Sequence, residues 1–252
     1  MIDLHSHILP GIDDGSKSLE TTLEMLQNAA ANAVDVIVAT SHYSPEADQR
    51  YDQVFAEVAQ RAADFNITLL PGMEYDYDRL SEVRPEAIRG VGNTNWVLID
   101  LKQPYLASGA NELIFNLRLR GKEILVAHPE RLFGQRYREN INKLTGEFAL
   151  QINSGSILGC YGKEAAMAAL DILSNYPCCL IAGDAHRPTH YRFPECEAKM
   201  RRFFPAEIVE VWMRENPRRL LAGEKLQSVQ VSPSCWRRLR WKLDLIINPA
   251  RH

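Results

Sequence analysis

The chain has 252 residues, of which 46 % are hydrophobic and 24 % are charged, and its formal net charge is −3. These values are typical of one large globular domain or two small ones, so they exclude a disordered or fibrous protein. No apolar run reaches the roughly 18 residues of a membrane-spanning helix, and the first residues lack the basic-then-apolar layout of a secretory signal. The five cysteines are odd in number and form no CxxC pair, which favours the reducing cytoplasm.

Apolar runs of strand length alternate with helical periodicity along the chain. We expect strands at 2–4, 34–40, 67–73, 96–101, 123–128, 148–152 and 179–183. Between them, one helical face is formed by Leu19, Leu23, Leu26 and Ala30, another by Phe55, Val58 and Ala62, and further helices are expected over 110–120 and 163–175. Because parallel strands need crossover connections, seven such units predict an α/β fold with a parallel sheet.

Residues 1–226 show no internal boundary, so the simplest closure of this sheet is a TIM-like barrel with one unit missing, a (β/α)7 barrel. An open doubly wound sheet is the alternative. No GxGxxG motif follows the first strand, so a dinucleotide-binding fold has no support.

The C-terminal segment, residues 227–252, differs in composition. It carries five cations against one carboxylate, a net charge of +4 that leaves −7 for residues 1–226. Tryptophans and leucines alternate with these cations after a linker-like stretch. One interpretation is an amphipathic segment that contacts a membrane surface or a partner. The other is a tail that packs on its own domain or is disordered.

Histidines and carboxylates gather at the ends of the predicted strands. Five of the seven histidines stand at or just beyond such an end, namely His5, His7, His42, His128 and His186. Four carboxylates share this placement, namely Asp14, Glu74, Asp100 and Asp184. Because the C-terminal ends of parallel barrel strands open on one face, these nine side chains are expected to meet at a single mouth.

Two short motifs make this prediction more specific. His5 and His7 form H-x-H, and residues i and i+2 of a strand point to the same side, so both imidazoles can hold one ion. Asp184 and His186 repeat this spacing after the last strand. A lone H-x-H is often a chance pair, but two pairs with further strand-end ligands favour a metal centre. Asp13-Asp14-Gly15 is typical of a turn from which one carboxylate can point inward.

Nine candidate ligands are too many for one tetrahedral zinc ion, which takes four. Two or three divalent ions that share bridging carboxylates would use them all, and mixed imidazole and carboxylate ligation suits Mn²⁺, Fe²⁺ or Zn²⁺. Three such ions, four carboxylates and a hydroxide leave a charge of about +1, which attracts phosphate. The sequence therefore predicts phosphoester hydrolysis by metal-bound hydroxide.

The segments MIDLHSHILPGIDDG, ATSHY, PGMEYDY, VLIDL, AHPER, QINSGS and AGDAH resemble, in this order, the polymerase-and-histidinol-phosphatase (PHP) superfamily. Within it the chain is similar to the bacterial capsular and exopolysaccharide tyrosine-protein phosphatases. The resemblance covers about residues 1–225. It implies a distorted seven-stranded barrel with three divalent ions, commonly manganese, with iron or zinc as alternatives.

The resemblance also implies how the ligands are shared. One ion would be held by His5, His7, Glu74 and Asp184; a second by Glu74, Asp100 and His128; the third by Asp14, His42 and His186. Arg131 would grip the substrate phosphate through two parallel hydrogen bonds, unless it forms a surface salt bridge with Glu130. Direct catalytic roles are thus expected for Arg131, Asp184 and His186.

Some neighbouring residues remain open. Similar proteins often have Glu in place of Asp100, and Asp is one methylene shorter. Either Arg187 or Arg192 could contact phosphate, and His190 is a general acid or a loop residue. Asn153 could hydrogen-bond a metal-bound water or the substrate, or it is a turn residue. An aromatic wall for a phenyl leaving group could come from Tyr75, Tyr77 and Tyr105.

Three functions compete. The leading hypothesis is a metal-dependent protein-tyrosine phosphatase in the cytoplasm, acting on the tail of a polysaccharide-biosynthesis tyrosine kinase. The second is a small-molecule phosphatase, for example for histidinol phosphate, or an exonuclease of the same superfamily; the charge of −7 on residues 1–226 disfavours nucleic acid. The third is a metal-stabilised binding module without activity, which retention of all nine candidate ligands disfavours.

Overall fold

A computed structural model of the chain describes residues 1–102, 110–132, 136–144, 147–231 and 235–247. The strands in these ranges pair in parallel and form two sheets, of order β1-β2-β3 and β4-β5-β6-β7-β8. Their bounds are β1 (Ile2–Ser6), β2 (Val36–Ala39), β3 (Thr68–Pro71), β4 (Glu74–Asp76), β5 (Trp96–Asp100), β6 (Glu123–Ala127), β7 (Ala149–Asn153) and β8 (Cys179–Ala182).

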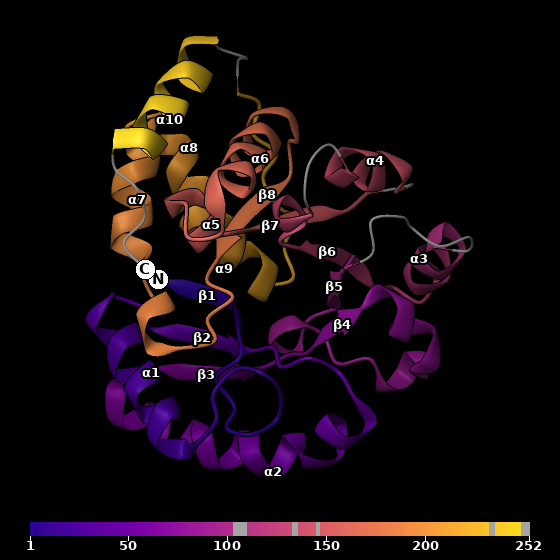
Figure 1. Ribbon diagram of the computed structural model, residues 1–252. Coiled ribbons are helices and arrows are strands. Elements are labelled where there is room, and N and C mark those ends of the chain that lie inside the picture. Colours follow the sequence, from indigo (N-terminus) through magenta and orange to yellow (C-terminus); the bar gives the residue numbers. More distant parts are fainter. Residues whose placement is uncertain (103–109, 133–135, 145–146, 232–234, 248–252) are drawn as a thin grey trace.

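The two sheets are joined into a distorted TIM-like barrel, which confirms the predicted fold class (Figure 1). Isolated parallel bridges close it at both seams, one between Ser6 and Ala185 and the other between His42 and Glu74. Ser6 ends β1, and Ala185 and His42 lie just beyond β8 and β2, whereas Glu74 is the first residue of β4. The seams therefore sit beside the residues expected to form the mouth.

The third strand expected from the sequence, residues 67–73, is divided. Its first part is β3 in one sheet, and β4 begins the other sheet after Gly72 and Met73. Pro71 has no N–H for a ladder, and the Gly72 N–H instead donates to the Tyr51 hydroxyl at 3.0 Å. A side chain at Gly72 would lie 2.7 Å from a Val38 methyl carbon, so glycine permits this close crossing.

Helices cover the outside of the barrel. Their bounds are α1 (Leu19–Ala31), α2 (Pro45–Ala62), α3 (Ala110–Leu119), α4 (Arg136–Lys143), α5 (Ser154–Leu158), α6 (Gly162–Asn175), α7 (Phe193–Arg201), α8 (Ala206–Glu210), α9 (Asn216–Leu221) and α10 (Cys235–Ile247), with a π-helical turn at Val211–Glu215. The helices predicted over 110–120 and 163–175 correspond to α3 and α6. On α1 the buried face is displaced by one residue from the predicted one, to Thr22, Met25, Leu26 and Ala29.

The core has two layers. The larger cluster fills the space between the strands and the helices. A smaller cluster inside the barrel contains Leu4, Leu98, Leu125 and Leu180, and Leu220 of α9 joins it. Residues two further along the same strands, such as Asp100 after Leu98, keep this inward direction because strand side chains alternate. The inner apolar layer therefore forms a floor beneath the polar mouth.

The register between β1 and β2 shifts between Asp3 and Ser6. Leu4 belongs to the interior cluster, yet His5 also points inward, where it meets Gln151 of β7. A local irregularity of this kind re-aims side chains at a barrel rim. It lets both His5 and His7 reach the mouth.

The C-terminal segment returns to the barrel as α10. Trp241 is fully buried against Phe203, and its indole N–H donates to the Ala166 carbonyl at 3.1 Å. Asp244 is buried beside it and pairs with Lys199 at 3.2 Å and with Arg202 at 2.7 Å. Among the described helices, none has both the length and the apolar character needed to span a bilayer.

Candidate metal centre

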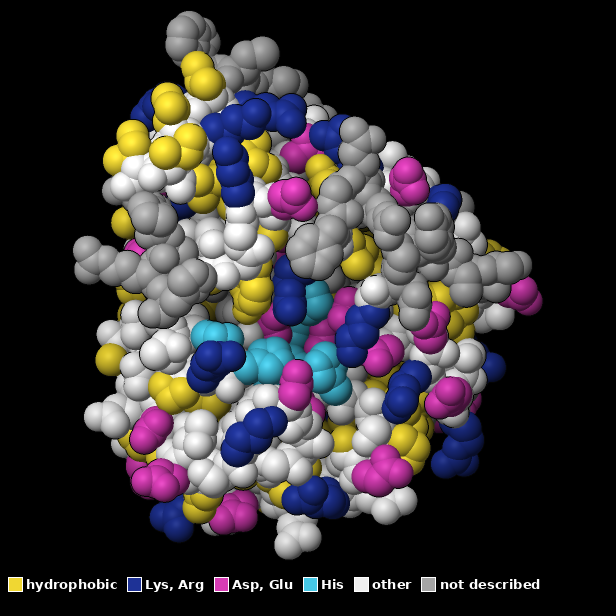
Figure 2. All heavy atoms as spheres, in the orientation of Figure 1, with side chains coloured by type: hydrophobic (Ala, Val, Ile, Leu, Met, Phe, Trp, Pro, Cys, Tyr) yellow, Lys and Arg dark blue, Asp and Glu magenta, His cyan; other side chains and the backbone are white. Residues whose placement is uncertain are grey.

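Figure 2 shows histidine side chains clustered in a hollow of the molecular surface, with carboxylates between them and arginine or lysine side chains around them. Ligand atoms from all nine predicted residues occur in four groups, within each of which the atoms lie within 4.8 Å of one another. The groups are His7, Asp14, His42 and His186; His5, His128 and Asp184; His5, His7 and Glu74; and Glu74, Asp100 and His128.

His5 and His7 face each other at the centre, with their Nε2 atoms 3.1 Å apart. The Nδ1 atom of His5 lies 3.1 Å from Gln151 Oε1, an oxygen that also accepts the His128 backbone N–H. The Nδ1 atom of His7 lies 2.7 Å from Asp13 Oδ2. Because both Nδ1 atoms face acceptors, a ring proton on each of them leaves the two Nε2 atoms directed into the same space. Burial opposes protonation of His7, but Asp13, Asp184 and Glu74 raise its pKa well above the usual value, so metal binding must displace a proton from this imidazole.

Glu74 Oε2 is the second central atom. It is buried, lies 3.3 Å from both His5 Nε2 and His7 Nε2 and 3.0 Å from His42 Nδ1, and has no hydrogen-bond partner in the described structure. A buried acceptor left in this way is costly unless a cation satisfies it. These residues fit a divalent metal ion, since lone pairs of three imidazoles and one carboxylate converge on one point.

Asp184 connects this centre to the other side of the mouth. Its Oδ1 lies 3.5 Å from His5 Nε2 and 3.4 Å from His7 Nε2. Its Oδ2 accepts hydrogen bonds from Asn153 Nδ2 at 2.9 Å and from Arg131 Nη1 at 2.6 Å. One carboxylate thus faces the metal ligands with one oxygen and the open side of the mouth with the other.

The outer group lies nearer to solvent. Asp14 Oδ1 is 3.5 Å from His42 Nε2 and 3.4 Å from His186 Nε2, and the Asp14 side chain is exposed. His7 joins this group as well as the central one. The ligand sharing implied by the family resemblance placed His7 only in the central set, whereas the geometry gives it a position between the two.

The cluster strongly favours positive charge. Burial opposes protonation of His128, but Asp100, Glu74 and Asp184 raise its pKa to about 9. Burial and the His7 charge instead lower the pKa of His186 to about 4. Burial also opposes ionisation of Glu74, yet the surrounding imidazoles hold the pKa of this carboxyl well below its usual range. Bound cations would take over the charge that protons supply here.

Backbone geometry adds a second sign of a functional site. Non-glycine residues with positive φ include His128, at 27°, and Asp184, at 49°. Such conformations cost free energy and tend to occur where surrounding structure holds a functional side chain in place. Asp3 supports the second of these residues, because its Oδ1 accepts the N–H groups of Gly183 at 2.7 Å and His5 at 3.2 Å.

Arg131 lies at the edge of the cluster, in the 3-10 turn Pro129–Arg131. It pairs with Asp184, and its guanidinium lies 4.7 Å from the centre of the Tyr161 ring. The expected alternative, a salt bridge with Glu130, is not what the structure shows. Glu130 is buried and accepts the Asn153 backbone N–H at 2.9 Å. Arg131 does not contact Glu130 in this way, and it lines the hollow beside the metal ligands while it pairs with Asp184.

The hollow next to the outer group has a volume of about 440 Å³ and is lined by Asp14, Arg131, Tyr161, His186, Arg187 and His190, among others. Arg192, the other candidate for phosphate contact, pairs with Glu195 through two bonds of 2.7 and 2.8 Å. Arg187 is thus the better placed of the two. His190 Nδ1 accepts the His186 backbone N–H at 3.2 Å, which leaves its Nε2–H as a donor.

Several supporting residues were not identified from the sequence. Asp13 orients His7, and Gln151 orients His5, although the D-D-G motif pointed only to a single inward carboxylate. Tyr161 lines three hollows around the cluster. Its position follows the α5 turn and carries no sequence signal. Gly15 is also required, because a Cβ there would lie 2.2 Å from the His7 carbonyl oxygen.

The predicted aromatic wall is not formed by Tyr75 and Tyr77. Both are buried in the outer core, and the Tyr75 hydroxyl accepts the Arg89 backbone N–H at 2.8 Å. Their side chains leave the strand end toward the helices because neighbouring strand residues point to opposite faces. Tyr105 lies outside the described residues.

A TIM-like barrel that gathers this many imidazoles and carboxylates beside a guanidinium defines a metal-dependent phosphoesterase. The family described as capsular polysaccharide synthesis, CpsB/CapC, matches residues 1–222. The chain belongs to this family, which confirms the resemblance noted from its motifs.

Individual relatives agree. Tyrosine-protein phosphatase YwqE of Bacillus subtilis is 28 % identical over 240 residues, which span 90 % of this chain and 93 % of that protein. The putative tyrosine-protein phosphatase CapC of Staphylococcus aureus is 26 % identical over 260 residues, spanning 96 % and 98 %. A chain from the crystal structures of B. subtilis YwqE and Streptococcus pneumoniae CpsB, described as unique metal-dependent tyrosine phosphatases, superimposes with a TM-score of 0.78 at 25 % identity, covering 93 % of this chain and 99 % of the other.

Proposed function

We propose that this chain is a metal-dependent protein-tyrosine phosphatase of a capsule or exopolysaccharide synthesis system. The observation that carries the proposal is the convergence of His5 Nε2, His7 Nε2 and the partnerless Glu74 Oε2 within 3.3 Å of one another. Membership of the CpsB/CapC family and the similarity to YwqE supply the substrate class.

The four ligand groups support three divalent ions, with manganese as the preferred metal and iron or zinc as alternatives. Glu74 is suited to bridge two of them, since Oε1 lies 3.1 Å from His128 and Oε2 faces the His5–His7 pair. Asp100 belongs to the group with Glu74 and His128, so its shorter side chain still reaches these atoms. When bound, such ions polarise phosphoryl oxygens and lower the pKa of water.

The protein's own groups position the substrate. Arg131 would exchange part of its contact with Asp184 for phosphate oxygens, which a guanidinium can bind in a bidentate manner. Arg187 lines the same hollow and adds a second cation. The Tyr161 ring, which already packs on Arg131, would provide an apolar side for the phenyl group.

The leaving group needs little assistance. A tyrosine phenolate has a pKa of about 10, so it departs more readily than an alkoxide. His190 can donate from Nε2 to the departing oxygen, because its Nδ1 is already an acceptor. Burial lowers the pKa of His190, which favours the neutral ring and hence a hydrogen-bonding role.

The physiological partner that fits this site is a phosphotyrosine segment of a polysaccharide-biosynthesis tyrosine kinase. A flexible peptide could present its ring to the mouth without unfolding of either protein. We place this encounter in the cytoplasm, in line with the odd number of cysteines and the lack of a CxxC pair.

The test compares phosphate release from a phosphotyrosyl peptide and from histidinol phosphate, each with added Mn²⁺ and with a chelator. We expect hydrolysis of the peptide that the chelator abolishes. Hydrolysis of histidinol phosphate alone would retain the metal chemistry but show that the substrate is a small molecule. Turnover of neither substrate by metal-loaded protein would contradict the proposal.

A further inference from the structure

Large hydrophobic side chains are exposed on two helices of the described structure. Phe115 and Leu119 lie on α3, and the other four lie on α10, namely Leu239, Leu243, Ile246 and Ile247, with exposed fractions of 48, 47, 63 and 72 %. The spacing i, i+4, i+7 and i+8 places the α10 residues on one side of the helix. We call this stripe the outer face of α10.

The opposite side of α10 is firmly attached to the barrel. Trp241 is fully buried, and Asp244 is 5 % exposed and pairs with two cations from the α7 region. Arg237 also donates to the Phe203 carbonyl at 2.9 Å. The outer face is therefore held in position by a packed inner face, and its exposure is not a consequence of a loose helix end.

Cations border the outer face on both sides. Arg238 and Lys242, four residues apart, flank one edge, and Arg240 flanks the other, by the 100° turn per residue of an α-helix. All three are exposed. The single carboxylate of α10, Asp244, is turned inward and neutralised. An apolar stripe between two cationic edges is typical of helices that lie in the surface of an anionic membrane.

We propose that the outer face of α10 is a docking surface for an anionic lipid bilayer. A second copy of the chain is the alternative occupant, but a two-fold contact would bring the same cationic edges together. A bilayer with anionic headgroups instead complements them, while its acyl region takes up the leucine and isoleucine side chains.

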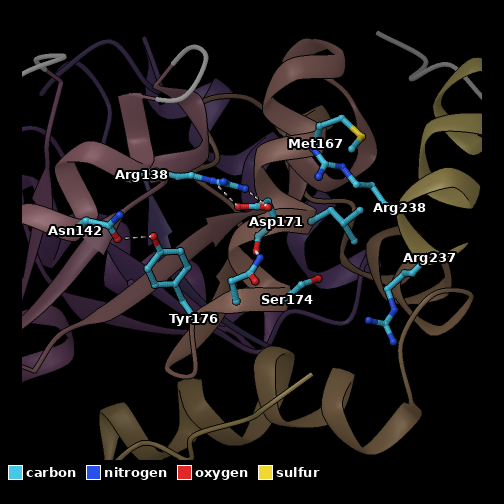
Figure 3. A pocket seen from close by; sticks show the side chains of 10 residues that line it. Arg138, Asn142, Met167, Asp171, Ser174, Tyr176, Arg237 and Arg238 are labelled. Atoms are coloured by element: carbon cyan, nitrogen blue, oxygen red, sulfur yellow. Dashed lines mark hydrogen bonds and ion pairs between the residues drawn. The ribbon is translucent and has the colours of Figure 1, made fainter. Parts of the chain in front are cut away.

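A pocket at the N-terminal half of α10 extends the cationic border. Its volume is about 610 Å³, and it is lined by residues of α4, α6 and α10 (Figure 3). The figure shows Arg138 joined to Asp171 on the α4 and α6 side, with Arg237 and Arg238 coming from α10. Asp171 balances Arg138, and the other two cations that line this pocket belong to α10.

Docking through α10 would leave the metal centre accessible. In Figure 2 the hydrophobic and cationic side chains of the α10 region lie at the upper edge of the molecule, away from the histidine-lined hollow. Attachment would therefore hold the mouth beside the membrane surface without covering it.

The experiment measures co-sedimentation of the full metal-loaded chain with vesicles of phosphatidylcholine alone and with about 30 % phosphatidylglycerol. The test variant is Leu243→Ser with Ile247→Ser, and the matched control is Phe115→Ser with Leu119→Ser on α3. We expect binding to anionic vesicles that falls at high salt and drops more than about tenfold in the α10 variant, because each serine removes apolar area from the bilayer contact. The control should bind like the parent chain.

A charge variant, Arg238→Glu with Lys242→Glu, should also lose binding, whereas Lys225→Glu should not. Hydrolysis of a soluble phosphopeptide serves as the readout of correct folding in all variants, so failure here is distinguishable from failure of the proposed function. The proposal is overturned by absent vesicle binding, by equal binding to neutral vesicles, or by equal losses in the α10 and α3 variants. Self-association that depends on Leu243 and Ile247, without vesicle binding, would assign the face to a second copy instead.

Discussion

His5 and His7 direct their Nε2 atoms at each other across 3.1 Å, while Gln151 and Asp13 occupy both Nδ1 atoms. Two imidazole nitrogens held this close repel unless a cation, either a proton or a metal ion, lies between them. The contacts of Gln151 and Asp13 thus orient both rings for metal before any ion binds.

Removal of a central ligand should abolish turnover. We expect His5→Ala and Asp184→Ala to reduce phosphopeptide hydrolysis to background and to lower the bound metal content, because each side chain contacts several other ligands of the centre. Circular dichroism should report a retained fold. Full activity in either variant would contradict the metal assignment.

Asp13 should control metal affinity without being a ligand. Asp13→Asn weakens the acceptor for the His7 Nδ1–H, so we expect a loss in metal affinity of about 10- to 100-fold. Excess Mn²⁺ should restore much of the activity of this variant. Asp64→Asn, at an exposed helix end, is the matched control. Unchanged affinity in Asp13→Asn, measured by metal titration, would refute the role.

Arg131 should act on the substrate and not on the metals. Arg131→Ala should lower kcat/KM by about 10²- to 10³-fold, because charge-assisted bonds to phosphate are lost. The metal content should remain unchanged. Arg192→Ala is the control, since Glu195 already engages that guanidinium. A larger loss in Arg192→Ala than in Arg131→Ala would reverse this assignment.

Metal affinity should depend on pH. In the metal-free protein the neighbouring carboxylates raise the pKa of His128 to about 9 despite its burial, so a proton must leave before this imidazole can bind. Below pH 9 the apparent affinity should therefore fall, by about tenfold per pH unit for each proton released. Calorimetric titrations with Mn²⁺ in buffers of different ionisation enthalpy would count these protons. Binding without proton release at pH 7 would contradict the expectation.

Much of the fold was predictable because strand-length runs and helical periodicity are local signals. The division of β3 from β4 was not, since it depends on how Gly72 crosses Val38, a contact between distant residues. The packing of Trp241, and with it α10, onto the barrel could not be predicted either, because it needs the partners Phe203 and Ala166.

The same distinction applies to the site. Candidate ligands such as His42 and Glu74 could be proposed from their position at strand ends, and the structure brings them to 3.0 Å. Tyr161 and Gln151 could not, because neither residue type nor position marks them. Their roles follow only from the closure of the barrel, which brings β7 beside β6 and β8 and α5 beside the mouth.

The most direct measurement is the rate of phosphotyrosyl-peptide hydrolysis together with the metal bound per chain, before stripping, after stripping and after return of Mn²⁺. Our expectation is that activity disappears with the metal and returns as the chain binds three ions. Hydrolysis that persists in metal-free protein, or full activity regained with no bound metal, would contradict it.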